Sequence, residues 1–177
     1  MTHNEIYKQL DHRWNKAIDL LIDVVFDITR YIKFEIEDTT TDNYNEFIEE
    51  INKDGYFTIS RDGTLSSIYE NQAVNIKARV WHDYHHYHSK LSFSYEDELK
   101  VLALQLKDID NYCSTKTIDT QTKEDAKSIL SIDIQQQVEY YQTHKCFVNE
   151  QRSFVRSIWF NDIYKCYRGQ VYRKRHR

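Results

Sequence analysis

The segment that decides the fold is residues 4–34, NEIYKQLDHRWNKAIDLLIDVVFDITRYIKF. Apolar residues recur in it every three or four positions, which is the period of one face of an α-helix. This face comprises Ile6, Leu10, Trp14, Ala17, Leu21, Val24, Ile28 and Ile32. The segment therefore predicts a long amphipathic helix that buries one side.

The rest of the chain extends this helical pattern. It contains no proline and only three glycines, so long helices can run without interruption. Ser94 is a candidate N-cap, with Asp97 at the capping-box position of the helix that follows it. Other helices are predicted over residues 44–51, 70–86, 123–144 and 149–167, with a loop over 114–122. Between them, residues 56–68 alternate in polarity around Asp62-Gly63, which predicts a small β-hairpin.

Length and composition bound the architecture. A chain of 177 residues, 40% hydrophobic and 29% charged, fits one domain that is long enough to bury a core. We therefore expect a mostly α, compact helical single domain over residues 1–177 with one small β-hairpin. Aspartates interrupt the longest apolar run, residues 17–28, and residues 1–10 lack a signal-peptide core. The sequence predicts no membrane span and a cytoplasmic location.

Charge and cysteine content exclude other classes. The net charge is −4, and the basic residues near the C-terminus form a short tail rather than a face with interleaved aromatic residues. Nucleic acid is therefore not expected as a partner. The three cysteines lack CxxC spacing, so neither a disulfide framework nor a cysteine zinc site is predicted.

Residues 81–98, WHDYHHYHSKLSFSYEDE, concentrate the residues that bind metals. His82 and His86 are four positions apart on a predicted helix, so their rings share a face and can bind one ion. Asp83 is rotated by about 100° and reaches that ion only from the margin or through water. If the chain reverses over residues 87–95, the next helix returns antiparallel and Glu98 faces the histidines. We predict His82, Asp83, His86 and Glu98 as ligands of zinc, or of iron or manganese.

A metal-free interpretation is also open. His85 and His88 lie on other faces of the predicted helix, where we expect exposure, and a histidine-rich helix can be a polar surface. A phosphohydrolase of the HD type would need another histidine and aspartate, for which His12 and Asp133 are candidates without a supporting pattern. A ferritin-like di-iron bundle would need paired Glu-x-x-His repeats on two helices, which are absent, so this is a minor alternative, as is the HD type.

The spacing His82-Asp83-x-x-His86, eleven residues and then Glu98 resembles the His-Asp-x-x-His…Glu signature of a coenzyme Q biosynthesis family, the fourth member of that pathway's protein series. The resemblance implies a helical fold, zinc bound through these residues, and oxidative loss of a carboxylate from an aromatic ring. The family usually has glycine shortly after the second histidine and just before the glutamate. This chain departs from that pattern with Ser89, Lys90 and Asp97.

The chain also resembles small bacteriophage proteins of unassigned activity. They share an Arg-x-Trp-His-Asp-x-x-His run, here Arg79 to His86, and a later helix with the pattern Gln-x-x-Tyr-Tyr-x-x-His. The matching positions on that helix and beyond are Gln137, Tyr140, Tyr141, His144, Gln151 and Phe154. This resemblance implies that the helix carrying Gln137 and His144 contributes to the same pocket.

These patterns predict a metal-dependent enzyme, either a hydrolase or a lyase of the oxidative-decarboxylase kind, that acts on a small oxygenated or anionic molecule. An ion with an open position polarises a bound oxygen or lowers the pKa of bound water. Arg79 and Asp83 are the candidate catalytic residues. Arg79 would receive an anionic group of the substrate, or instead form an ion pair with Glu98, Glu96 or Glu70. The alternative is a phage-type protein that binds a host protein or sequesters a small molecule, with a structural metal or none.

Overall fold

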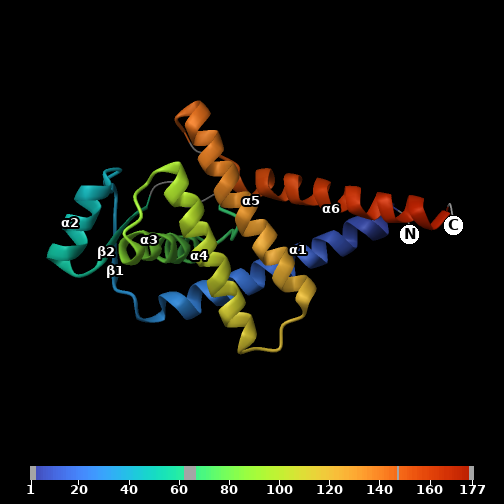
Figure 1. The fold of residues 1–177 in the computed structure, drawn as a ribbon, viewed down its shortest axis with the longest axis horizontal. Helices are drawn as coiled ribbons and strands as arrows, with labels where there is room; N and C mark the ends of the chain where they lie inside the picture. The colour runs from blue at the N-terminus through green and yellow to red at the C-terminus, as the bar shows by residue number, and fades with distance from the viewer. Residues whose placement is uncertain (1–2, 62–66, 147, 176–177) are drawn as a thin grey trace.

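The structure, a computed structural model, describes residues 3–61, 67–146 and 148–175; for His3 and residues 166–175 it describes the backbone alone. Within these ranges the chain is mostly helical, as predicted (Figure 1). The elements are α1 (His3–Ile28), the 3-10 helix η1 (Thr29–Tyr31), β1 (Phe34–Glu37), α2 (Tyr44–Asp54), β2 (Phe57–Ser60), α3 (Gln72–Ser89), α4 (Tyr95–Ser114), α5 (Thr120–His144) and α6 (Gln151–Arg175).

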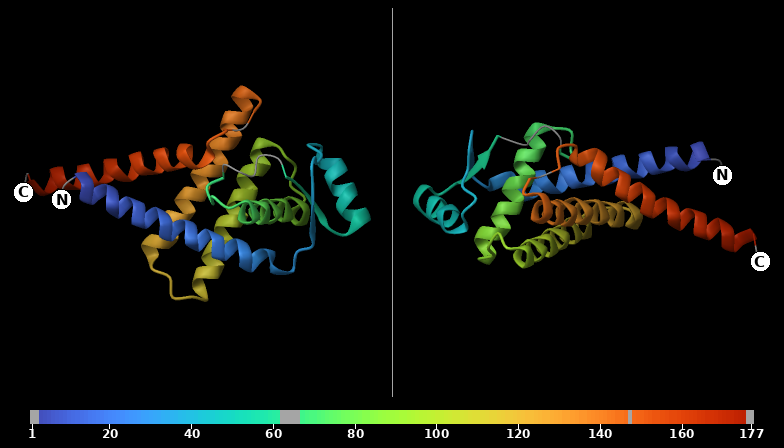
Figure 2. Two further views of the ribbon diagram at one scale, coloured as in Figure 1. Left: turned by 180° about the vertical axis from the view of Figure 1, so that it is seen from behind. Right: turned by 90° about the horizontal axis from the view of Figure 1, so that it is seen from above.

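Helix α1 is the centre of the fold, because it contacts α3, α4, α5 and α6 (Figures 1 and 2). Its predicted apolar face is buried from Ile6 to Val24, and Ile28 at its end is partly buried. Trp14 is fully buried and meets Trp159 of α6 edge to face, with ring centroids 5.7 Å apart. The first and last helices are thereby packed together.

The single continuous helix predicted over residues 4–34 is too long. Helix α1 ends at Ile28, η1 follows, and residues from Phe34 onward form a strand. The sequence from Phe34 to Glu37 alternates apolar and acidic side chains, which is the strand period rather than the helix period. The chain therefore leaves the helix where its pattern changes.

The small sheet is parallel, and most of the second arm of the β-hairpin predicted over residues 56–68 lies outside the described residues, so the hairpin stays a prediction. Strand β2 pairs with β1, with Phe34 opposite Phe57 and Glu37 opposite Ser60, and α2 forms the crossover between them. The expected turn at Asp62-Gly63 lies outside the described residues. A second apolar cluster joins α2, β2 and α3 and consists of Phe47, Ile51, Phe57, Ile59, Ile76 and Val80. This cluster fixes one side of α3.

None of the described helices contains a stretch that is both long and apolar enough to cross a bilayer.

Candidate metal centre

The turn between α3 and α4 begins where α3 ends in a left-handed residue. Lys90 has φ +54°, and the amides of Lys90 and Leu91 donate to the carbonyls of Tyr87 (3.3 Å) and His86 (3.0 Å). This pair of hydrogen bonds is the Schellman arrangement, which usually places glycine at the left-handed position. Here a lysine takes the left-handed position at the end of α3.

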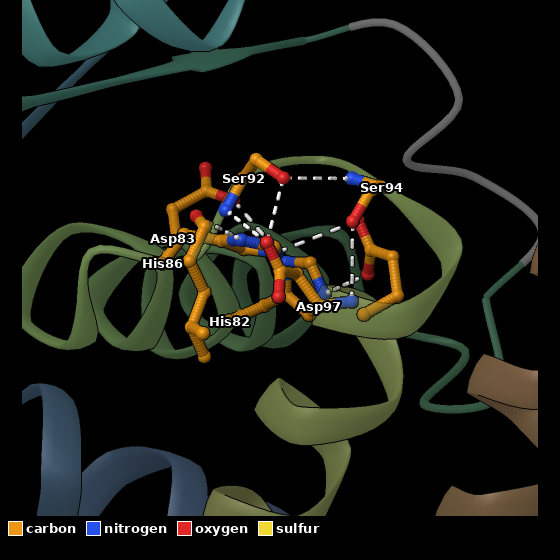
Figure 3. A network of polar contacts seen from close by, with 8 residues as sticks. His82, Asp83, His86, Ser92, Ser94 and Asp97 are labelled. Carbon is orange, nitrogen blue, oxygen red and sulfur yellow. Dashed lines mark hydrogen bonds and ion pairs between the residues drawn. The ribbon is translucent and has the colours of Figure 1, made fainter.

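The start of α4 is fixed by short-range side-chain hydrogen bonds. Ser94 caps the helix as predicted and accepts from the Asp97 amide at 3.3 Å. Asp97 accepts from the amide and the hydroxyl of Ser92, at 2.9 and 2.6 Å (Figure 3). With both ends of the turn anchored, the residue after Asp97 has a defined direction. That residue is Glu98.

Glu98 lies between the two histidines, as the spacing predicts. One oxygen, Oε2, is 2.9 Å from Nε2 of His82, and the other, Oε1, is 3.4 Å from Nε2 of His86. One ligand atom from each of the three residues lies within 4.8 Å of the other two. In the part of the chain that the structure describes, this is the group of at least three such side chains that could hold a metal ion.

Both imidazoles are oriented through their Nδ1 atoms. His86 Nδ1 lies 3.0 Å from the Leu91 carbonyl, which can only accept, so Nδ1 carries the proton and donates. His82 Nδ1 lies 3.3 Å from a carboxylate oxygen of Asp83 and donates in the same way (Figure 3). Metal-binding histidines commonly have such a partner on the other ring nitrogen. Each ring therefore presents Nε2 to the site.

The Nε2 atom of His86 is an unsatisfied polar atom in the core. The His86 side chain is fully buried, and its Nε2 has no hydrogen-bond partner among the described residues. Although Glu98 Oε1 is 3.4 Å away, the two atoms do not form a hydrogen bond. Buried polar groups of this kind are rare and destabilising without a partner. A metal ion bound by Nε2 would satisfy it, so the residues present fit a divalent cation.

Electrostatics couple His82 to Glu98. Burial by itself lowers the pKa of His82, but hydrogen bonds and charges from Asp83 and Glu98 outweigh burial and raise the pKa to about 10. Burial raises the pKa of Glu98, but the two histidines outweigh it and lower the pKa to about 2. Without an ion, His82 is therefore protonated and Glu98 is ionised, so a proton lies between them where the cation would bind. Metal binding must displace that proton.

The site is closed on one side and open on the other. His86 is fully buried, whereas the side chain of His82 is 25% exposed and that of Asp83 is 24% exposed. Three protein ligands with solvent on one side leave a coordination position for another molecule, as in catalytic zinc sites. Structural zinc sites instead close four protein ligands around the ion.

Two predicted site residues, Asp83 and Arg79, do not belong to the group of three candidate ligands. Asp83 contacts Nδ1 of His82, on the opposite side of the ring from Nε2, which suits a positioning role better than a ligand role. Arg79 Nη1 donates to the Ser60 carbonyl at 2.7 Å, at the end of β2. Glu70, one of the acids expected to pair with it, forms an ion pair with Arg152. A role for Arg79 toward substrate stays a prediction.

Helix α4 crosses α3 rather than running antiparallel along it, in contrast to the prediction (Figures 1 and 2). Glu98 contacts His82 and His86, and Asp108, ten residues later, contacts Trp81 and His85. In an antiparallel pair, Asp108 would face a residue about ten positions earlier on α3, since both helices rise equally per residue. Because the two helices cross, α4 contacts two faces of α3. Glu98 contacts the face with His82 and His86, and Asp108 contacts the face with Trp81 and His85.

Sequence reasoning missed the partner of His85. This histidine is 8% exposed rather than exposed as expected, and its Nε2 lies 2.7 Å from Asp108 Oδ2. The same oxygen accepts from Nε1 of the fully buried Trp81 at 2.8 Å. The one sequence signal was the four-residue spacing of Trp81 and His85, which places both on one face.

The helix carrying Gln137 and His144 is placed differently from the expectation. Gln137 Oε1 accepts from the Val148 amide at 3.3 Å, so it ties the end of α5 to the turn before α6. His144 is exposed and lies against Tyr140, with ring centroids 4.2 Å apart. These residues belong to the α5–α6 turn, and the candidate metal group does not include them.

Comparisons of this chain with protein-family models, with curated proteins and with solved structures found no match.

Proposed function

We propose that this protein is a metal-dependent enzyme that acts on a small oxygenated or anionic molecule. His82, His86 and Glu98 would bind one divalent ion, zinc in the first place and iron or manganese as alternatives. The observation that carries the proposal is the fully buried Nε2 of His86, which has no hydrogen-bond partner among the described residues and lies beside a second imidazole and a carboxylate.

The residues around the ligands would have separate tasks. Asp83 would hold the His82 ring in position through Nδ1, and the Leu91 carbonyl does the same for His86. When bound, the ion would polarise a substrate oxygen or lower the pKa of a bound water. Solvent reaches the site from the side of His82 and Asp83, so a substrate would enter there. Arg79 is the residue we propose for receiving its anionic group.

Two substrate classes follow from the proposal. The resemblance to the coenzyme Q family suggests an aromatic ring that carries a carboxylate, with oxidative loss of that carboxylate as CO2. That reaction would need dioxygen as a co-substrate to accept the electrons, because zinc itself is redox-inert. An exposed metal centre also suits hydrolysis of a soluble phosphate compound. A screen of the metal-loaded protein against carboxylated phenols and against nucleotides and cyclic nucleotides separates the two. Arg79→Met should weaken turnover without reducing metal content.

One observation favours a second candidate, an interaction protein without a catalytic metal. Glu98 already contacts His82 at 2.9 Å, so an ion pair holds the turn partly together without an ion. In this case α3 and α4 would present a binding surface for a host protein, and the histidines would be structural.

Metal analysis of protein purified without chelators tests the proposal. We expect close to one zinc, iron or manganese ion per chain, lost in His82→Ala and Glu98→Gln while the helical circular dichroism persists. His88→Ala and Glu96→Gln are matched controls, because both residues are exposed neighbours of the ligands. Parent protein that stays free of metal even after reconstitution would end the enzyme proposal in favour of the second candidate.

A further inference from the structure

A second candidate site lies between α1, α6 and the segment before α3. It is an open cavity of about 490 Å³, and Arg152, Ser153 and Arg156 of α6 face Asp11 of α1 and Glu70 across it. None of the residues that line it belongs to α3 or α4. The cavity is therefore separate from the candidate metal centre.

Two guanidinium groups line this cavity from one helix. Arg152 and Arg156 are four residues apart, so they lie one turn apart on the same face of α6. Arg152 is held rigidly: Nη1 donates to the Ile68 carbonyl at 2.7 Å, Nε pairs with Glu70 at 2.6 Å, and the guanidinium lies over the Trp14 ring. One half of a two-arginine site is thus already in place.

Arg156 has donors that remain unsatisfied. Its Nη2 pairs with Asp11, and the guanidinium lies 4.9 Å from the Phe160 ring centroid. Its Nε is buried and has no acceptor within the described parts of the chain. A buried donor on a charged group is destabilising unless it finds an acceptor. Arg156 lines the cavity, so a molecule bound there can supply an acceptor for its guanidinium group.

Glu70 is held less firmly than its partner Arg152, because the side chain of Glu70 is 66% exposed and that of Arg152 is 21% exposed. In the second pair, Asp11 and Arg156 are both accessible, at 48% and 41%. Burial lowers the pKa of Arg152, Glu70 raises it, and the positive charge of Arg156 lowers it again. An anion between the two arginines would relieve their repulsion, and the exposed acids can turn toward water when it binds.

We propose that this cavity binds a small phosphate, either free or as a monoester, between Arg152 and Arg156. Guanidinium groups match the geometry of phosphate oxygens, and Ser153, which lines the same cavity, offers a hydroxyl as a further donor. Tyr7, which is 50% exposed, forms an apolar wall beside these donors. This wall suits a monoester with a flat ring better than the free ion.

Calorimetric titration of the full chain with inorganic phosphate and with phenyl phosphate, at constant ionic strength, tests the proposal. The titrations use the Glu98→Gln background, so that phosphate cannot bind at the metal centre. We expect binding in about the millimolar range or tighter, weakened about tenfold or more by Arg156→Gln. Asp11→Asn should instead strengthen binding, because it removes the acid that competes for Arg156. Lys165→Gln removes one positive charge from α6, as Arg156→Gln does, but at an exposed position, and it should have no effect on binding.

The outcomes separate the ligand sources and the sites. Tighter binding of phenyl phosphate than of phosphate identifies a monoester ligand, and equal binding identifies the free ion. If Arg156→Gln does not fold, Ser153→Ala should still weaken binding several-fold. Binding that is absent, that the Glu98→Gln change abolishes, or that neither Arg156→Gln nor Asp11→Asn alters overturns the proposal.

Discussion

At the scale of single residues, the two histidines of the candidate metal centre differ in what orients them. His86 depends on the backbone carbonyl of Leu91, which no substitution removes, whereas His82 depends on the side chain of Asp83. Because a partner on Nδ1 fixes both the proton position and the ring direction, it contributes to metal affinity without touching the ion. Asp83 is therefore the residue in which this effect can be measured.

Asp83→Asn should weaken zinc affinity by about 10- to 100-fold while leaving the three proposed ligands intact. Competition against a chromophoric chelator measures the change in zinc affinity. Glu96→Gln, in the first turn of the neighbouring helix α4, is the control. Unchanged affinity in Asp83→Asn would show that the Asp83 contact does not position His82. Complete loss of binding would instead assign Asp83 to the ligands.

Asp133 gives a pH-dependent prediction. Burial raises the pKa of this carboxyl from 3.8 to about 7, although its contacts with Gln151 and Gln137 oppose the change. The folded state thus holds the proton more tightly than the unfolded state, and the carboxyl lowers stability progressively as pH rises from about 4 to 7. Above that window the penalty is constant.

Asp133→Asn removes this penalty, so its stability relative to the parent should increase between pH 5 and pH 8. Thermal unfolding of both proteins at the two pH values measures the difference. The introduced amide retains an oxygen that can accept the 2.8 Å hydrogen bond from Gln151. The substitution therefore removes the ionisable group and keeps this hydrogen bond. A difference in Tm that is independent of pH would contradict the assignment of a raised pKa to Asp133.

At the scale of elements, the geometry of the candidate metal ligands depends on how α3 ends. The Leu91 amide donates to the His86 carbonyl, and the Leu91 carbonyl accepts from the His86 ring, so one residue binds both backbone and side chain of the ligand. This arrangement requires Lys90 to adopt a left-handed conformation, φ +54°, that is unfavourable for a residue with a Cβ. The turn is therefore locally strained at the position after the helix.

Lys90→Gly should raise the free energy of unfolding by up to about 1 kcal/mol, because glycine adopts positive φ without the Cβ penalty. Ser89→Gly is the matched control one position earlier. Ser89 is the last residue of α3 and does not need a left-handed conformation, so glycine there should lower stability, by up to about 0.5–1 kcal/mol. Urea denaturation measures both, and destabilisation by Lys90→Gly would mean that the lysine side chain stabilises the turn more than its backbone strain costs.

At the scale of the whole molecule, residues distant in sequence close the core around α1. Trp14 and Trp159 are both fully buried and pack edge to face, so α6 is fixed to α1 near the two ends of the chain. Arg13 links α1 to α5 through Asp125, with Nη2 to Oδ1 at 2.6 Å. The position of α6, and with it the proposed phosphate cavity, depends on these contacts.

Trp159→Ala should lower the free energy of unfolding by about 3–5 kcal/mol, since it leaves a large cavity against Trp14. Phe26→Ala, on the exposed side of α1, should cost far less, because Phe26 is 46% exposed. Denaturant unfolding followed by circular dichroism compares the two. If Trp159→Ala costs no more than Phe26→Ala, the packing of α6 on α1 does not contribute to the stability of the fold.

Local patterns in the sequence determined most of the helices and the clustering of the three candidate metal ligands. Helical periodicity, caps such as Ser94 and the spacing of His82, His86 and Glu98 depend on interactions within a few residues or across one short turn. The helix over residues 44–51 and the later helices were therefore predicted with errors mainly at their ends. The His-x-x-x-His spacing placed both rings on one face before any tertiary contact was known.

Only the tertiary structure decided the features that join distant segments. The pairing of β1 with β2 in parallel depends on the crossover through α2 and on the apolar cluster that joins α2, β2 and α3. The crossing of α4 over α3 brings Asp108 to His85, and the packing of α6 on α1 brings Arg156 to Asp11. The surfaces that form these contacts would also be buried in many other arrangements of the same helices, so their burial alone does not select the observed one. Their geometry follows from how side chains of the whole core fit together, which local periodicity does not encode.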